Sequence, residues 1–186
     1  KQCLMELGTK QDDLYIIETN RNIIEDLCSQ GFKCYRSISE IKGIENNVKV
    51  GIVANWGPDH LKTANELIDI GCKRMIIEKP ISNSINELQI FKKRVQENNI
   101  FVTVHYHWQY TKIFDLIKST AYELKLAEAI GIRISGGAVG LSTNGTHFLD
   151  FACKVLDAKP KTVISDLDID YINPRDKSLA YIAGSA

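Results

Sequence analysis

Short apolar runs alternate with amphipathic segments through the first hundred residues of the chain. The runs predict four buried strands, at residues 13–18, 48–53, 74–77 and 100–104. Apolar residues spaced three or four apart predict helices between them, over residues 20–30, from Pro58 to Ile70 and from Ser84 onward. Strands separated by helices of this length indicate βαβ units in a parallel sheet, whose strands are covered on both faces.

Local signals mark the ends of these helices. Pro58 suits a first helical position, and Gly71 can close the same helix. Ser84 and Glu87 have the spacing of a capping box. The chain therefore carries start and stop signals where the apolar period predicts them.

The pattern changes after about Tyr110. The elements expected there are a helix at 111–119, a strand at 128–135, a Gly-rich segment at 136–140, a helix that starts within 143–147 and runs through Val155, a strand at 161–171, and another from 178 to 183. No internal repeat or low-complexity linker interrupts this order.

Composition excludes several classes of protein. The 186 residues hold 23 Lys and Arg against 23 Asp and Glu, so nothing supports a nucleic-acid or anionic-membrane partner. No apolar stretch is long enough to span a membrane, and the first residues do not form a secretory signal. The five scattered cysteines predict reduced thiols, without a disulfide framework or a cysteine zinc site, in a cytoplasmic protein.

Candidate ligand-binding residues follow the predicted strands, because ligands of doubly wound sheets bind at the carboxyl ends of the strands. These positions are Glu18, 54–56, 78–80 and 105–107. A carboxylate such as Glu18 can accept hydrogen bonds from a ribose diol and repels a 2′-phosphate, which favours NAD over NADP. The Gly-rich phosphate loop that should precede it is absent, and an isolated acid at a strand end is often only a solvated charge.

These residues carry a resemblance to a known family. Glu78-Lys79-Pro80 after an apolar strand is similar to the E-K-P signature of the glucose–fructose oxidoreductase/inositol dehydrogenase (Gfo/Idh/MocA) family. Further landmarks follow in the family's order: 54–60, 104–110, 144–150 with its G-x-H-x-x-D pattern, and 158–160. The resemblance covers residues 13–186 and implies a piece of a longer chain, incomplete at both ends.

The resemblance implies an NAD(P)-dependent dehydrogenase or reductase acting on a sugar, a cyclitol or a nucleotide-linked sugar. Lys79 would hydrogen-bond the reacting oxygen and stabilise developing alkoxide charge, and His147 would be the general base or acid. Asp150 would orient His147 or cap its helix. The expected cofactor-binding residues are Glu18, Asn55, Trp56, His60, Glu78, Lys79, Pro80 and His107. Of these, His60 is expected to shape the site and not to react.

Three positions depart from the family pattern. Thr143 stands where many members have Asp, four residues before the motif His. Gln109 stands where many have Arg, and Asn55-Trp56 replaces a Thr-Pro pair. Because Thr143 cannot act as an acid, the proton relay uses His147 with Lys79 alone, or serves another substrate, or has been lost.

Rival functions remain open. His105-Tyr-His107 is an H-x-H pair, and period 2 puts both rings on one face of a strand, where with His60 or His147 they could bind zinc in a metal-dependent hydrolase. A non-catalytic nucleotide- or sugar-binding protein of the same fold is a second alternative. An interaction module without any ligand is a third.

The predicted fold is α/β. Residues 1–108 would form a Rossmann-like parallel sheet lacking its first strand and Gly-rich loop. Residues 109–186 would form part of an α+β substrate domain with a mainly antiparallel sheet, an architecture that the resemblance supplies. Such sheets commonly form subunit contacts in the family, so we expect a homo-oligomer, a small sugar-like substrate and no metal.

Overall fold

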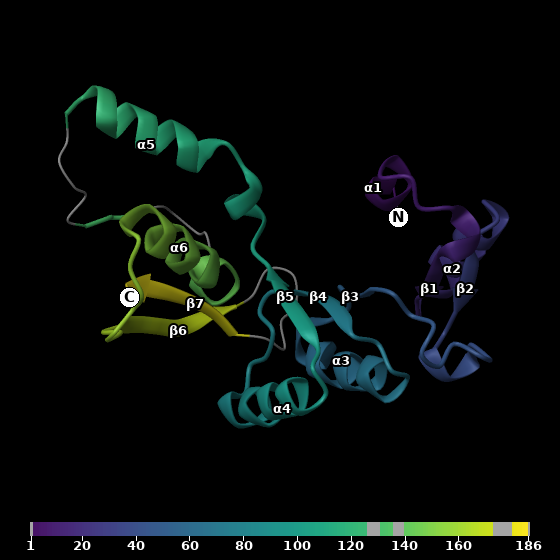
Figure 1. The fold of residues 1–186 in the computed structure, drawn as a ribbon. Helices are drawn as coiled ribbons and strands as arrows, with labels where there is room; N and C mark the ends of the chain where they lie inside the picture. Colours follow the sequence, from purple (N-terminus) through teal and green to yellow (C-terminus); the bar gives the residue numbers. More distant parts are fainter. Residues whose placement is uncertain (1, 126–130, 136–139, 173–179, 186) are drawn as a thin grey trace. The chain divides into compact units, whose positions relative to one another are not determined.

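The computed structural model of the chain describes residues 2–125, 131–135, 140–172 and 180–185 (Figure 1). The chain divides into two compact units. The first comprises Lys1–Ile76 and Ser84–Thr103, and the second comprises Ile77–Asn83 and Val104–Ala186. The segment 77–83 therefore belongs with the C-terminal part of the chain, although its first two residues are the end of a strand, residues 74–78, that begins in the first unit.

The first unit begins with a short helix, α1 (Gln2–Glu6), a 3₁₀ turn, η1 (Gln11–Asp13), and a βαβ segment. Strands β1 (Tyr15–Ile17) and β2 (Lys33–Tyr35) pair in parallel around helix α2 (Arg21–Ser29). The Asn20 side chain caps this helix by accepting the N–H of Asn22 at 3.0 Å. Strand β2 is absent from the sequence prediction, because its three residues are too few to establish a period. A second 3₁₀ turn, η2 (Ile38–Glu40), follows.

A separate sheet has three parallel strands in the order β3 (Gly51–Val53), β4 (Arg74–Glu78), β5 (Phe101–His105). The connections are η3 (Gly57–Asp59) with α3 (His60–Asp69), and α4 (Ile85–Glu97). Figure 1 shows both helices along one side of this sheet. The α/β class is therefore as predicted, and each of these elements lies within a few residues of its predicted position.

Two glycines set the packing of α3 on this sheet. A Cβ at Gly51 would lie 2.6 Å from Cδ1 of Leu67, a buried residue of α3, so the helix approaches β3 more closely than any side chain there would allow. Gly71 has φ +85° and ends α3, as the sequence predicts. The N–H groups of Cys72 and Gly71 bond the carbonyls of Leu67 and Ile68 at 3.0 and 2.9 Å, the pattern of a Schellman motif.

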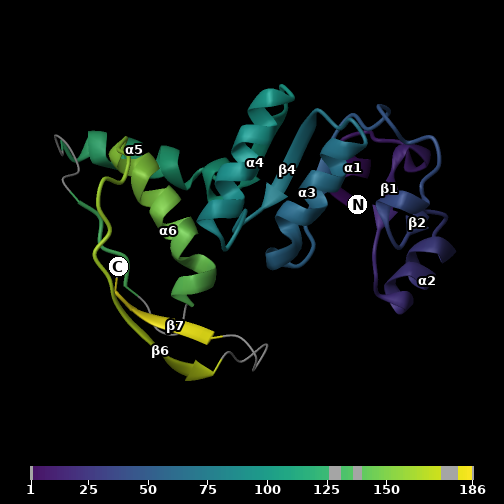
Figure 2. The same cartoon turned by 90° about the horizontal axis from the view of Figure 1, so that it is seen from below.

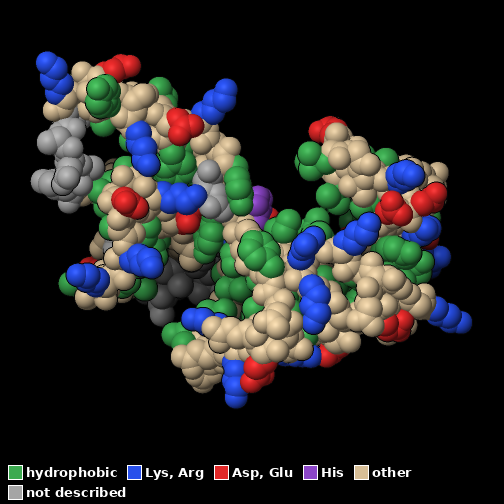
Figure 3. Space-filling model, in the orientation of Figure 1, with side chains coloured by type: hydrophobic (Ala, Val, Ile, Leu, Met, Phe, Trp, Pro, Cys, Tyr) green, Lys and Arg blue, Asp and Glu red, His purple; other side chains and the backbone are tan. Residues whose placement is uncertain are grey.

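The sheet is covered on one face only among the residues described, and in this respect the sequence prediction is wrong. Met75 and Ile77 are buried, whereas Ile52, Ile76 and Phe101 are 49%, 38% and 67% exposed. Because α3 and α4 pack against the same side, alternate strand positions face solvent. Figure 3 shows hydrophobic side chains at the surface over these strands.

The second unit contains η4 (His107–Tyr110), α5 (Ile113–Glu123), α6 (Leu141–Leu156) and an antiparallel pair, β6 (Asp166–Ile172) with β7 (Ala180–Ser185). Helices α5 and α6 contact through Phe114 and Phe151, whose ring centroids are 5.1 Å apart. Figure 2 shows β6 and β7 side by side. The pairing shifts in register between Asp168 and Tyr171, as at a β-bulge.

Three predictions for this unit change. The strand predicted at 161–171 begins only at Asp166. Residues 131–135 form no strand, and the rest of the predicted strand at 128–135 lies outside the described residues, as do 136–139 of the Gly-rich segment. Helix α6 begins at Leu141, earlier than expected, because Gly140 adopts φ +66° and starts it. No helix in the described part of the chain is both long and apolar enough to cross a membrane.

Candidate active site

Glu78, Lys79 and Pro80 lie at the carboxyl end of β4, and all three are half-buried. They belong to the second unit, together with His105, His107 and His147. The E-K-P segment and the motif histidine are therefore parts of one compact body, although they are nearly seventy residues apart in the chain. This unit contains both residues predicted to be catalytic.

The Glu78 carboxylate is held from two directions. Its Oε1 lies 2.7 Å from Nδ1 of His105, the last residue of the neighbouring strand β5. Its Oε2 accepts the backbone N–H of Lys79 at 3.3 Å. Since an ionised carboxylate only accepts hydrogen bonds, Nδ1 of His105 carries the proton of this contact.

His147 is buried, with 4% of its surface exposed, in the second turn of α6. The sequence prediction placed it at the helix start, and the earlier start at Leu141 corrects this. Asp150 lies about one turn further along the same helix. Atoms Nδ1 of His147 and Oδ2 of Asp150 are buried and have no hydrogen-bond partner among the described residues.

Aromatic rings surround His147. The ring of His107 meets it at 72° with centroids 4.6 Å apart, and the ring of Tyr106 meets it at 87° and 5.5 Å. Trp108 lies nearly parallel to it, at 20° and 5.8 Å. Trp108 in turn packs against Phe148 and Phe151 of α6. This packing explains why an imidazole that is predicted to react is also buried.

Burial lowers the pKa of His147 below its ordinary value of 6.5. The positive charge of Lys79 lowers the pKa further, and so does His107. Glu78 and Asp150 act in the opposite direction, without reversing the shift. His147 is therefore neutral at pH 7, the form in which an imidazole accepts a proton.

The H-x-H pair does not form the strand-borne site that its spacing predicts. Strand β5 ends at His105, and His107 begins η4, so the period of 2 does not extend across both residues. His105 contacts Glu78, whereas His107 packs against His147. The described residues contain no group of three or more His, Cys, Asp or Glu side chains that could hold a metal ion.

The other predicted cofactor residues belong to the first unit. Glu18 follows β1, and its Oε1 accepts the N–H groups of Thr19 and Asn20 at 2.7 and 2.9 Å. In the turn after β3, Asn55 donates its side-chain amide to Thr63 at 3.0 Å, and Nε2 of His60 lies 3.1 Å from the Asn55 carbonyl oxygen. His60 is 2% exposed, so it holds this turn from within, whereas Trp56 is 55% exposed.

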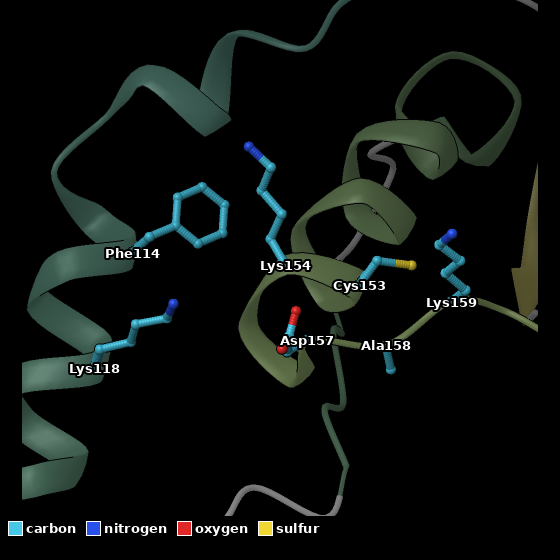
Figure 4. Close-up of a pocket in the computed structure, with 7 residues that line it drawn as sticks. All are labelled: Phe114, Lys118, Cys153, Lys154, Asp157, Ala158 and Lys159. Atoms are coloured by element: carbon cyan, nitrogen blue, oxygen red, sulfur yellow. The ribbon is translucent and has the colours of Figure 1, made fainter.

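Two cavities of the second unit are lined by residues other than Lys79 and His147. One, of about 510 Å³, lies between α5 and the end of α6 and is lined by Phe114, Lys118, Cys153, Lys154, Asp157, Ala158 and Lys159 (Figure 4). Its lysines surround the carbonyl end of α6, where positive charge is favourable. The other, of about 390 Å³, is lined by Trp108, Thr111, Ile113, Ile134, Phe148 and Phe151. Neither contains a predicted catalytic residue.

Sequence reasoning missed two features of this site. The contact between His105 and Glu78 was not predicted, although the positions of both residues at strand ends selected them as candidates. The packing of Tyr106 and Trp108 on His147 had no signal, because contacts between distant aromatic residues leave no period. Two of the residues that depart from the family pattern, Gln109 and Thr143, have side chains that lie outside the described part of the structure.

No protein-family model and no curated protein sequence matches the chain. Solved structures do match it. One is the WlbA dehydrogenase from Bordetella pertussis in complex with NADH and UDP-GlcNAcA, with TM-score 0.65 and 14% identity over 89% of this chain and 52% of that one. Another is myo-inositol 2-dehydrogenase from Lactobacillus plantarum, with TM-score 0.63 and 15% identity over 77% and 48%.

A third is GenD2 from gentamicin A biosynthesis in complex with NAD, with TM-score 0.61 and 16% identity over 76% of this chain and 45% of that one. This chain thus spans about half the length of the structures that it matches. At identities this low, the structural similarity establishes the fold alone. It is the Rossmann-like fold of these oxidoreductases.

Proposed function

We propose that this chain is part of an NAD-dependent oxidoreductase that transfers hydride at a hydroxyl or carbonyl carbon of a sugar, a cyclitol or a nucleotide-linked sugar. NADP is the second cofactor candidate. The observation that carries the proposal is that Glu78, Lys79 and His147 belong to the same compact unit. Within it, the Lys79 charge lies close enough to lower the pKa of His147. The named neighbours, an inositol dehydrogenase and a dehydrogenase crystallised with NADH and a nucleotide-linked sugar, support it.

Two carboxylates at the ends of parallel strands can each accept hydrogen bonds from ribose hydroxyls. Glu18 directly follows β1 in the first unit, Glu78 is the last residue of β4 and belongs to the second unit, and each carboxylate oxygen can accept more than one hydrogen bond. Their existing contacts with N–H groups therefore leave acceptor capacity for ribose hydroxyls. When bound, the nicotinamide supplies the hydride acceptor or donor, which no side chain provides.

Lys79 and His147 divide the remaining chemistry. The Lys79 ammonium donates a hydrogen bond to the reacting oxygen and stabilises negative charge on it. His147 removes the hydroxyl proton in oxidation and returns it in reduction. Its lowered pKa keeps it neutral for the first of these tasks, and the aromatic packing excludes water from one side of the ring.

The test combines NADH binding with turnover, both measured on the full-length protein that contains this chain. NADH fluorescence should report binding to the protein, and oxidation or reduction should be measured with myo-inositol and with UDP-linked sugars. Lys79→Ala should abolish turnover and leave the NADH affinity within a few-fold. Lys92→Ala is the matched control, because Lys92 is an exposed charge on α4. This variant should retain both turnover and NADH affinity.

The outcomes separate the alternatives. Near-normal turnover by Lys79→Ala would remove the catalytic assignment. NADH binding without turnover on any sugar would favour the non-catalytic member of the same fold, which the Thr143 departure also suggests. Failure to bind NADH or NADPH would overturn the proposal. Assembly with a second copy of the chain and a cytoplasmic location remain predictions.

A further inference from the structure

The contact between His105 and Glu78 joins the ends of two neighbouring strands at the E-K-P segment. Nδ1 of His105 lies 2.7 Å from Oε1 of Glu78, and Oε2 of Glu78 accepts the N–H of Lys79. The carboxylate therefore has a partner on each oxygen, and its plane is fixed. Of these two contacts, only the hydrogen bond from the Lys79 N–H would be left to orient the Glu78 carboxylate if His105 were removed.

The His105 ring is itself held in place. Tyr110, at the end of η4, stacks on it at 19° with ring centroids 6.2 Å apart. The His105 and Glu78 side chains are 39% and 38% exposed, so the pair lies at the surface of the unit and not in its core. A contact at this depth contributes little to folding, because water competes for both groups.

We infer that His105 is a positioning residue for the cofactor, acting through Glu78. This inference rests on the proposed function, in which Glu78 accepts a hydrogen bond from the nicotinamide ribose. His105 holds the carboxylate in one orientation before the cofactor arrives, so that binding does not have to order it. The same contact, through Glu78 and the Lys79 N–H, steadies the backbone that carries the Lys79 ammonium.

The experiment compares three variants by NADH titration and steady-state kinetics. His105→Ala should raise both the Kd and the KM for NADH about tenfold, the effect of losing roughly one oriented hydrogen bond, and change kcat less than about threefold. His105→Asn should restore most of the affinity, because its amide can donate from a position near that of Nδ1. Arg21→Ala removes another surface contact to a carboxylate, that with Glu25 at 2.8 Å, and should change nothing.

Each result decides one question. Wild-type affinity in His105→Ala would overturn the inference and leave the proposed function standing. Equal loss in His105→Ala and His105→Asn would also overturn it, since the donor would then be irrelevant. Absence of NADH binding by the wild-type protein would instead overturn the proposed function, and the inference with it. The thermal unfolding temperatures of all variants should lie within a few degrees of that of the wild type. Misfolding is then excluded as the cause of a weaker NADH affinity.

Discussion

The rings of His107 and His147 meet nearly edge to face, with their centroids 4.6 Å apart, and His107 is exposed whereas His147 is buried. An exposed imidazole thus stands directly beside the buried one that is proposed to exchange a proton with substrate. Charge on either ring disfavours charge on the other, and His107 contributes to the lowered pKa of His147. The protonation of His147 is therefore coupled to the charge of a ring that solvent reaches.

His147 should make folding stability depend on pH below neutrality. The unfolded chain binds the proton at about pH 6.5, whereas the folded chain binds it only at lower pH. Between these values the unfolded state holds more protons, so the free energy of unfolding falls as the pH falls. His147→Gln should flatten this slope as the pH is lowered from about 7 through the ordinary pKa of histidine in urea titrations, with Lys92→Ala as the control. An unchanged slope in His147→Gln would contradict the burial of an unprotonated ring.

Removal of His107 should raise the pKa of His147. His107→Gln deletes a group whose positive charge opposes protonation of its neighbour, while burial and Lys79 continue to lower the pKa. The pKa of His147 should therefore move toward 6.5 without reaching it, as followed by NMR titration of the ring protons. An unchanged or lower pKa of His147 in this variant would contradict the role of His107 in opposing its protonation.

Truncation of Trp108 should affect both stability and titration. The indole covers the His147 ring and packs against Phe148 and Phe151, so Trp108→Ala removes aromatic contacts and admits water. We expect the free energy of unfolding to fall by about 2 kcal/mol, less than for a fully buried Trp. The pKa of His147 should rise, because its ring is desolvated less. Trp56→Ala is the control, because the Trp56 side chain is 55% exposed. It should lower the free energy of unfolding by less than about 0.5 kcal/mol and leave the pKa of His147 unchanged.

Gly51 should tolerate no side chain. In Gly51→Ala the new Cβ would lie 2.6 Å from Cδ1 of Leu67 and 3.3 Å from Sγ of Cys72, both on buried residues. Either Leu67 or α3 must shift, and we expect a loss of about 1–3 kcal/mol in chemical denaturation. Gly57→Ala is the matched control, because no atom lies within 4 Å of the position that its Cβ would take. Equal stability of the two variants would contradict the close approach of α3 to β3.

Much of the first unit follows from local pattern. The apolar runs predict β3, β4 and β5 within a few residues, and Asn20 and Ser84 accept N–H groups at the starts of α2 and α4. Pattern works here because strands and helices impose their own periods on the chain. It fails for β2, which is too short to show a period, and for residues 131–135, whose β-branched residues favour a strand that has no partner among the described residues.

The candidate site divides in the same way. The sequence by itself determined which residues stand at strand ends, and thereby selected Glu18, Glu78, Lys79 and the histidine pair at the end of β5. Only the tertiary structure decided that His105 contacts Glu78, that His107 contacts His147, and that His147 is buried beneath Trp108. The physical reason is that a residue's place on a strand depends on its near neighbours along the chain. Its partner, burial and pKa depend on groups that folding brings from tens of residues away.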